Sequence, residues 1–129
     1  MTEITDTNLW ATTLGKGVED KTPGERDARE RLRAAYLSFR DRARILAAEI
    51  PRDPPDYTVH DISHLDAPWE MAGLIAGSDY PLTASEAFVL GGAFLVHDLG
   101  MSLAAYPEGM EALRKEGGWG DTVSALWHP

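Results

Sequence analysis

The segment after residue 22 most constrains the fold, because it carries start and stop signals for one long helix. Thr22 can accept hydrogen bonds from first-turn amides, Pro23 suits the first helical position, and Glu25 completes a capping box. Three prolines between residues 51 and 55 stop a helix. The sequence therefore predicts a helix from residue 23 to about Ile50. Its apolar stripe at helical spacing is Leu32, Ala35, Tyr36, Phe39, Ala43, Leu46 and Ala47.

A second helix is predicted around the apolar residues that follow Pro68. Proline is tolerated only within the first turn of a helix, so this helix is expected to begin near residues 65–67. It should end near Gly77. His60 then lies in the preceding loop, and His64 lies at or next to the helix N-terminus.

Thr83 and Glu86 form another capping box, which predicts the start of a third helix. It is expected to reach His97-Asp98 and to stop at Leu99-Gly100, because glycine commonly follows a helix C-terminus. The small residues 91–93 allow a neighbouring helix to pack closely. The predicted buried stripe is Ala87, Leu90, Gly91, Phe94 and Leu95.

The remaining segments carry weaker helix signals and no clear strand pattern. A helix is indicated over residues 107–115, and the tail to Pro129 could form one more, so the expected fold class is all-α. Residues 1–22 are interpreted as a loose lead-in, apart from one short turn that could dock Leu9, Trp10 and Leu14 on the rest. Residues 23–129 are expected to form one helical domain.

The first long helix also carries arginines along one flank of its apolar stripe. Acidic residues lie close to them in sequence, so the pattern favours a solvated face with helical ion pairs. A surface for a partner or a phosphate is the alternative. The arginines concerned are Arg26, Arg33, Arg40 and Arg44.

The formal net charge is −9, and the basic residues are concentrated in the first half. Only Arg114 and Lys115 lie after Pro54. This argues against direct nucleic-acid binding, which needs clustered cations, and is compatible with cation binding or with a solvated acidic surface. The chain has no cysteine, so a metal would need His, Asp or Glu ligands, which favours ions such as Mn, Fe, Zn or Mg.

The N-terminal residues are acidic and polar, without the basic and apolar regions of a signal peptide. No apolar run approaches the roughly 20 residues that span a bilayer. A cytoplasmic location with no membrane partner is the expectation.

Three of the four histidines lie in two short motifs, YTVHDISH at residues 57–64 and FLVHDLG at residues 94–100. The second motif places His97 and Asp98 at the end of an apolar helix, where a buried carboxylate needs a compensating partner. A divalent cation would supply one, since imidazole and carboxylate form an ordinary ligand set. The alternative is that His97 caps the helix C-terminus and Asp98 is exposed.

An apolar helix that ends in His-Asp-Leu-Gly, preceded about thirty residues earlier by a histidine heading a helix, resembles the HD-domain superfamily of metal-dependent phosphohydrolases. The resemblance covers roughly residues 57–105. It implies an α-helical bundle in which His64, His97 and Asp98 bind a divalent metal ion (Mn, Fe, Zn, Ni or Mg). It also implies catalytic roles for Asp98 and for His60, which would assist phosphate binding, transfer a proton or line a second metal site.

Three neighbouring residues have open interpretations. His60 could instead be a loop histidine that bonds nearby backbone. Asp61 and Asp66 could orient imidazoles from a second layer around the metal. They could equally be acids favoured by the helix N-terminus.

The sequence departs from the family pattern downstream, where a later aspartate normally completes the metal site. Asp121 is the sole aspartate after Asp98 and is considered as a substitute ligand. The interpretation preferred here is that the chain resembles the N-terminal part of the HD domain of larger bacterial HD proteins. The expected fold is then an HD-like bundle that is incomplete at its C-terminus.

Two functions follow from this interpretation. The first is metal-dependent hydrolysis of a nucleotide or another phosphate ester. The second is a noncatalytic, truncated HD-like interaction domain, for which a homodimer or missing C-terminal domains would be the partners. An unstable fragment without independent activity is a third possibility.

Overall fold

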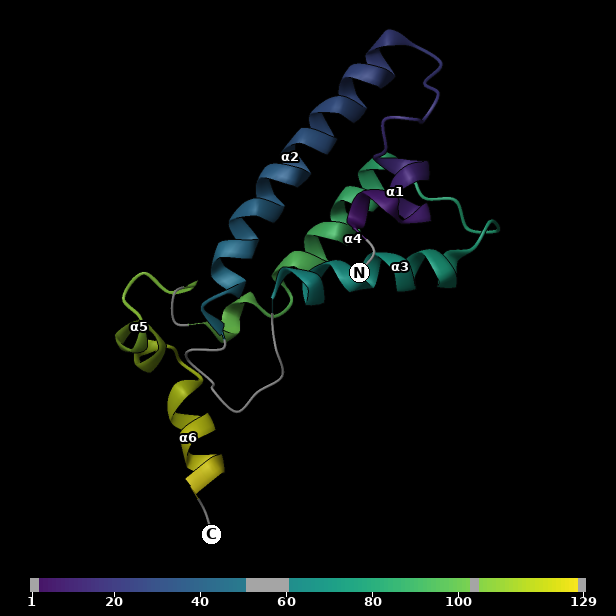
Figure 1. Ribbon diagram of the computed structural model, residues 1–129. Helices are drawn as coiled ribbons and strands as arrows, with labels where there is room; N and C mark the ends of the chain where they lie inside the picture. Colours follow the sequence, from purple (N-terminus) through teal and green to yellow (C-terminus); the bar gives the residue numbers. More distant parts are fainter. Residues whose placement is uncertain (1–2, 51–60, 103–104, 128–129) are drawn as a thin grey trace.

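The computed structural model describes residues 3–50, 61–102 and 105–127. Within these ranges the chain forms helices and no strand, so the all-α prediction is confirmed. Figure 1 shows the long helix α2 beside a group formed by α1, α3 and α4. The helices are α1 (Asn8–Thr13), α2 (Pro23–Ala47), α3 (Ile62–Ala76), α4 (Ala84–Val96), α5 (Met110–Lys115) and α6 (Trp119–Trp127), with the short 3-10 helices η1 (Ile4–Asp6) and η3 (Leu99–Met101).

Helix α2 begins at the predicted residue, but the predicted capping box is not completed, because the Glu25 carboxylate accepts from the amide of Lys21 and not from that of Thr22. The Thr22 side chain accepts from the amide of Glu25, and Pro23 occupies the first turn. The helix ends at Ala47, a few residues before the predicted end. The predicted stripe faces the core except for Ala35, which is exposed. Its fully buried members are Tyr36, Ala43 and Ala47.

Three aromatic rings form the centre of the core. Trp10, Tyr36 and Trp69 come from α1, α2 and α3, and their ring centroids are 5.4–5.7 Å apart in tilted or edge-on contacts. Such aromatic pairs add about 0.5–1.5 kcal/mol each to the stability gained from burying apolar area. The three side chains therefore join α1, α2 and α3 into one packed unit.

The polar atoms of this centre are paired with one another. The indole N–H of Trp69 donates to the Tyr36 hydroxyl at 2.9 Å, and that hydroxyl donates to the carbonyl oxygen of Gly91 at 3.3 Å. Burial raises the pKa of the Tyr36 phenol above its ordinary value, so the hydroxyl stays protonated and can donate. The chain of hydrogen bonds links α3 to α2 and α2 to α4.

Helix α4 can approach these rings closely because residue 91 is a glycine, which has no side chain. A Cβ atom at this position would lie 2.4 Å from Cζ2 of Trp69 and 2.6 Å from Cε2 of Tyr36. No side chain fits at such distances, so only glycine permits this close helix contact. The predicted role of the small residues is confirmed at Gly91, whereas Gly92 is in ordinary contact distance of Phe39.

The prediction of a loose N-terminal segment was wrong for Ile4 and Thr7, which are buried. Ile4, Leu9, Trp10 and Leu14 all belong to the hydrophobic core. The Thr7 side chain caps α1 by accepting from the amide of Trp10. The short turn expected to dock here is confirmed, and it contributes one of the three central rings.

The prediction that the arginine flank of α2 is a solvated face was wrong for two of its members. Arg33 donates to the carbonyl oxygens of Leu14 and Gly15 at 2.6 and 3.1 Å. Arg40 forms an ion pair with Asp66 of α3. Sequence neighbours suggested partners within the helix, but the fold brings acceptors from other elements to this flank. Arg44 behaves as predicted and pairs with Asp41 of α2.

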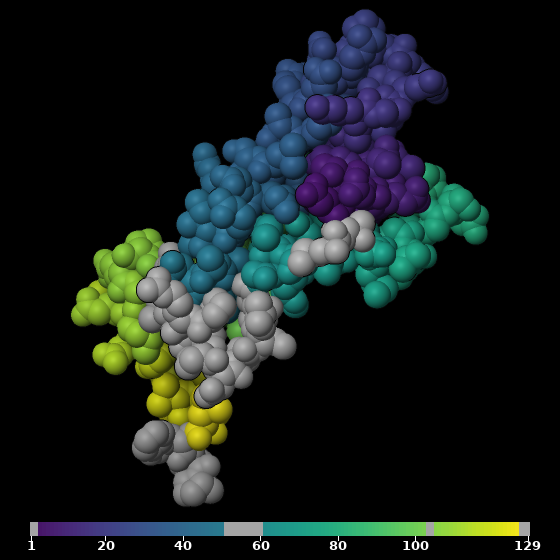
Figure 2. All heavy atoms as spheres, viewed as in Figure 1, coloured from purple at the N-terminus to yellow at the C-terminus, as the bar shows by residue number. Residues whose placement is uncertain are grey.

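Helices α5 and α6 lie at one end of the molecule, away from the aromatic centre (Figures 1 and 2). None of their described residues belongs to the hydrophobic core. Their existence was predicted from the sequence, although α5 begins at Met110 and not at residue 107. Across the described ranges, no helix combines the length and the apolar character that crossing a membrane requires.

Candidate metal centre

The first turn of α3 positions His64. Asp61 caps this helix, because its carboxylate accepts from the backbone N–H of His64 at 3.1 Å. The helix therefore begins at Ile62, earlier than the predicted residues 65–67, and Pro68 lies inside it. The prediction relied on proline at the helix start, whereas the cap formed by Asp61 decides where the helix begins.

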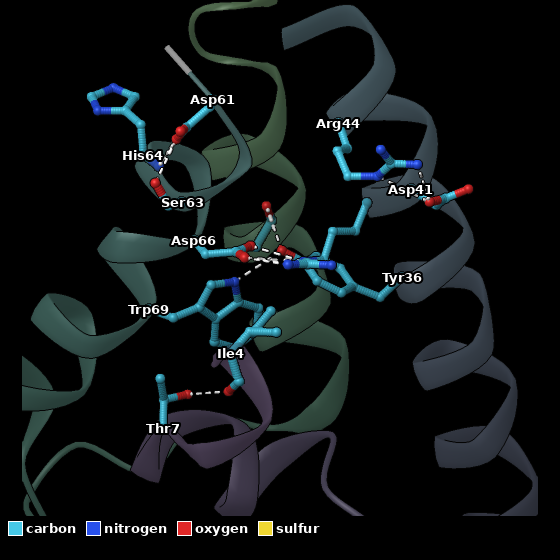
Figure 3. A network of polar contacts seen from close by, with 12 residues as sticks. Ile4, Thr7, Tyr36, Asp41, Arg44, Asp61, Ser63, His64, Asp66 and Trp69 are labelled. Carbon is cyan, nitrogen blue, oxygen red and sulfur yellow. Dashed lines mark hydrogen bonds and ion pairs between the residues drawn. The ribbon is translucent and has the colours of Figure 1, made fainter. Parts of the chain in front are cut away.

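Hydrogen bonds at this cap change the acidity of Asp61. The Ser63 hydroxyl and then the backbone N–H of His64 stabilise its ionised form, and they hold the pKa of Asp61 below its ordinary value. Of the two interpretations left open for Asp61, the structure supports the helix N-terminal acid. Figure 3 shows Asp61, Ser63 and His64 together at this end of α3.

The end of α4 positions His97 and Asp98. The helix ends at Val96, His97 is its C-cap residue, and Asp98 precedes η3. The prediction that the helix stops at Gly100 was wrong, because Gly100 lies within η3 and does not have a positive φ angle. The last turn of α4 is therefore followed directly by the His-Asp pair.

The three candidate ligands meet at one carboxylate oxygen. Nε2 of His64 lies 3.0 Å from Oδ2 of Asp98, and Nε2 of His97 lies 2.8 Å from the same atom. One potential ligand atom from each of the three residues lies within 4.8 Å of the other two. About two-fifths of each imidazole side chain is exposed, and about one-fifth of the Asp98 side chain. The cluster therefore opens to solvent on its histidine side.

A hydrogen bond fixes which nitrogen of His97 faces the cluster. Its Nδ1 lies 2.7 Å from the carbonyl oxygen of Phe94. Because a carbonyl oxygen only accepts, Nδ1 carries a proton, and Nε2 of the neutral ring presents a lone pair. Metal-ligating histidines commonly make this contact through the nitrogen that does not bind the metal. Asp98 is not exposed as the helix-cap alternative expected, since its side chain is about one-fifth exposed and its Oδ2 lies against Nε2 of His97.

The donor set suits a divalent cation. The lone pair of a neutral His97 and the carboxylate of Asp98 repel one another at 2.8 Å unless a proton or a cation lies between them. Zinc binds imidazole nitrogen and carboxylate oxygen at about 2.0–2.2 Å, so two ligands of one ion are at most about 4 Å apart. Small side-chain movements would bring the three atoms to such distances.

The outcome differs among the other predicted site residues. His60 lies outside the described residues. Asp121 is in α6, and the group of potential ligands within the described ranges does not include it. The Asp66 carboxylate is paired with Arg40.

The ion pair between Arg40 and Asp66 was not predicted. Nε of Arg40 lies 3.0 Å from Oδ1 of Asp66, and Nη2 contacts Oδ2. The Asp66 carboxylate holds the pKa of Arg40 above its ordinary value. Arg40 lies next to Phe39, within the apolar stripe of α2. This position in the sequence is the signal that could have indicated a partner in a neighbouring helix.

An apolar hollow of about 420 Å³ adjoins the cluster. It lies between α3 and α4, and His64 is at its polar end. Two large apolar side chains of α3 that line the hollow are strongly exposed, Met71 by 59% and Ile75 by 80%. Leu74 of α3 and Val89 of α4 are also exposed, by 73% and 69%.

A family model described as HD-CE matches residues 54–127, a range that contains His64, His97 and Asp98. No curated protein and no solved structure matches the chain. The family match confirms the resemblance to HD-domain proteins that the two histidine motifs suggested. The chain belongs to the HD-CE family.

Proposed function

We propose that this protein is a metal-dependent phosphohydrolase that acts on a nucleotide or another phosphate ester. The observation that carries the proposal is the convergence of His64, His97 and Asp98 on one point, with Nε2 of both rings within 3.0 Å of the Asp98 carboxylate. These residues come from two helices and are brought together only by the fold. Membership of the HD-CE family supports the same assignment.

In this proposal His64, His97 and Asp98 hold a divalent ion, such as Mn, Fe, Zn, Ni or Mg. The ion would polarise a phosphoryl oxygen and make a water molecule more acidic. The Phe94 carbonyl keeps the His97 ring oriented, and Asp61 fixes the backbone that carries His64. Asp98 supplies negative charge between the two rings and can accept a proton from the attacking water. His60 remains a proposed phosphate or proton partner.

The charge distribution affects how a phosphate ester could bind. The chain after Pro54 contains only two basic residues and is strongly acidic, so a phosphate ester would be repelled by the protein alone. A bound divalent cation would reverse the local charge at the cluster. Substrate binding, as well as the hydrolysis itself, is therefore expected to depend on the metal ion.

The first test is metal content and metal titration of the purified protein, without chelator and without a histidine tag. We expect near-stoichiometric binding in the wild-type chain and loss of binding in His97→Ala and Asp98→Asn. Glu70→Gln is the matched control, because Glu70 is an exposed acid of α3 outside the cluster. Unchanged stoichiometry in both cluster variants would show that these residues are not the ligands.

The second test is hydrolysis. A panel of nucleotides and simple phosphate monoesters is incubated with the metal-loaded protein, and phosphate release is measured. Turnover that disappears in Asp98→Asn supports the proposal. A chain that binds metal stoichiometrically and hydrolyses no member of the panel contradicts the enzymatic part and favours a noncatalytic role.

The second candidate function is a noncatalytic interaction domain, and the exposed apolar side chains of α3 and α4 favour it. Exposed apolar side chains beside an apolar hollow are typical of contact sites. A homodimer through the hollow predicts a mass that rises with concentration in sedimentation experiments. The double variant Met71→Ser/Ile75→Ser should then remain monomeric, while a wild-type chain that is monomeric at all concentrations argues against the dimer.

A further inference from the structure

The ion pair between Arg40 and Asp66 connects α2 to α3 close to the candidate metal centre. Both Nε and Nη2 of the guanidinium contact the carboxylate, which makes the pair two-pronged. The side chains are 27% and 12% exposed, so the pair is largely shielded from water. Paired contacts of this kind fix orientation as well as distance, because the planar fork matches the carboxylate.

Asp66 and His64 lie on opposite flanks of α3. Successive residues of an α-helix are about 100° apart around its axis. Leu65, which is fully buried, points into the core between them. Figure 3 shows the result, with Asp66 directed towards Tyr36 and Trp69 while His64 projects from the other side of the helix.

Contacts on two opposite flanks of α3, one on each side of its buried face, therefore hold this helix in place. On one flank Asp66 is bound to Arg40 of α2, and on the other His64 contacts Asp98 after α4. A turn of α3 about its axis that loosened the first contact would also move His64 relative to Asp98. With side chains reaching about 5–6 Å from the helix axis, a rotation of about 20° displaces their ends by about 2 Å. Metal and catalytic sites tolerate only about 0.5 Å.

We propose that Arg40 is a positioning residue for the metal centre, which acts through Asp66 to set the rotation of α3 and thereby the place of His64. The inference rests on the proposed function, because it requires that His64, His97 and Asp98 bind metal. Arg40 touches none of these three side chains in the contacts described above. Its effect is on how well the ligands are arranged.

The chain offers a matched control in the ion pair between Arg29 and Asp20. Arg29 also lies on α2 and also contacts its aspartate through Nε and Nη2, with side-chain exposures of 18% and 5%. This pair secures the segment before α2 and does not involve α3. Removal of either arginine breaks a two-pronged ion pair, and removal of Arg29 also breaks its bond to the Thr13 carbonyl oxygen. Only the loss of Arg40 should change the position of His64.

The experiment is titration of the full chain with Mn²⁺ and Zn²⁺, for wild type, Arg40→Ala, Arg40→Lys and Arg29→Ala. Metal-free thermal unfolding of each variant selects a temperature at which all are folded. Arg40→Ala is expected to weaken metal binding at least tenfold, in the range seen when residues that orient metal ligands are removed. Arg40→Lys should recover part of the loss, and Arg29→Ala should remain within about twofold of wild type.

Asp66→Asn provides a second variant that keeps the shape of the side chain and removes its charge. It should weaken metal binding in the same direction as Arg40→Ala. Wild-type affinity in Arg40→Ala, or equal losses in Arg40→Ala and Arg29→Ala, would overturn the positioning role and leave the metal site standing. A wild-type chain that binds no metal would instead overturn the proposed function, and this inference with it.

Discussion

The aromatic centre and the candidate metal centre both involve α3 and α4, but they have opposite character. Trp69 and Gly91 lie in the dry, fully packed interior, whereas His64 and His97 are about two-fifths exposed. Polar atoms in the centre are paired within the protein, as in the bond from Trp69 to Tyr36. The cluster instead gathers atoms that carry lone pairs. The core supplies stability, whereas the cluster gathers groups that could hold a cation.

The largest effect should come from the centre. Trp69→Ala removes a fully buried ring and the partner of the Tyr36 hydroxyl, and it should lower the free energy of unfolding by about 3–5 kcal/mol. Chemical denaturation measures the change. Trp119→Ala is the control, because this half-exposed tryptophan of α6 lies outside the core and should cost about 1 kcal/mol or less. Equal losses of unfolding free energy in Trp69→Ala and Trp119→Ala would contradict the assignment of Trp69 to the core and Trp119 to the periphery.

The metal centre should add stability only when it is filled. Metal at about 100 times its dissociation constant raises the free energy of unfolding by about 2.7 kcal/mol. Wild type should show this increase, and His97→Ala should not. Without metal the two proteins should differ by about 0.5 kcal/mol or less, since the His97 side chain is well exposed. An equal metal-induced shift in both proteins would place the ion elsewhere.

Neighbouring glycines of α4 should respond in opposite directions. Gly91→Ala forces a Cβ atom against Trp69 and Tyr36 and should destabilise the protein by about 1–3 kcal/mol. Gly92→Ala has room beside Phe39 and should stabilise it by up to about 1 kcal/mol, because alanine favours a helix. Thermal unfolding distinguishes the two variants, and destabilisation by both would mean that helix packing at Gly92 is tighter than described.

A smaller effect is expected at the helix cap beside the cluster. Asp61→Ala removes the cap of α3 and should cost about 1 kcal/mol, while Asp61→Asn retains the capping geometry. Because folding lowers the pKa of Asp61, its ionised form stabilises the folded state above the ordinary value of 3.8. This contribution is lost as the pH falls through the lowered pKa.

The pH dependence can be measured against the Asn variant, which does not titrate. The difference in unfolding free energy between wild type and Asp61→Asn should be constant above about pH 5 and should shrink at lower pH. A difference that grows on acidification would contradict the stabilised carboxylate.

Much of the helical framework could be predicted from local sequence. The caps formed by Thr22 and by Thr83 with Glu86 are contacts between residues three positions apart, so the sequence contains all the information they need. The same holds for the all-α class and for the buried faces of α2 and α4. The start of α3 was missed because two local signals competed, and the Asp61 cap prevailed over the preference of Pro68 for the first turn.

Contacts between distant residues could not be predicted in this way. The pairing of Arg40 with Asp66 and the burial of Ile4 in the core depend on which helix faces meet. The histidine motifs identified His64, His97 and Asp98 as candidates through a family resemblance, and the arrangement of helices brings them within reach of one another. Their role as metal ligands stays a prediction, as does the role of His60.

The sequence by itself determined the helices, because capping, proline stops and apolar periodicity act over a few residues. The tertiary structure decided which polar side chains have partners, because an ion pair or a ligand cluster depends on positions that are 26 or 34 residues apart in the chain. Helix α3 illustrates both. Its cap follows from adjacent residues, and its rotation, which places His64 beside Asp98, follows only from packing against α2 and α4.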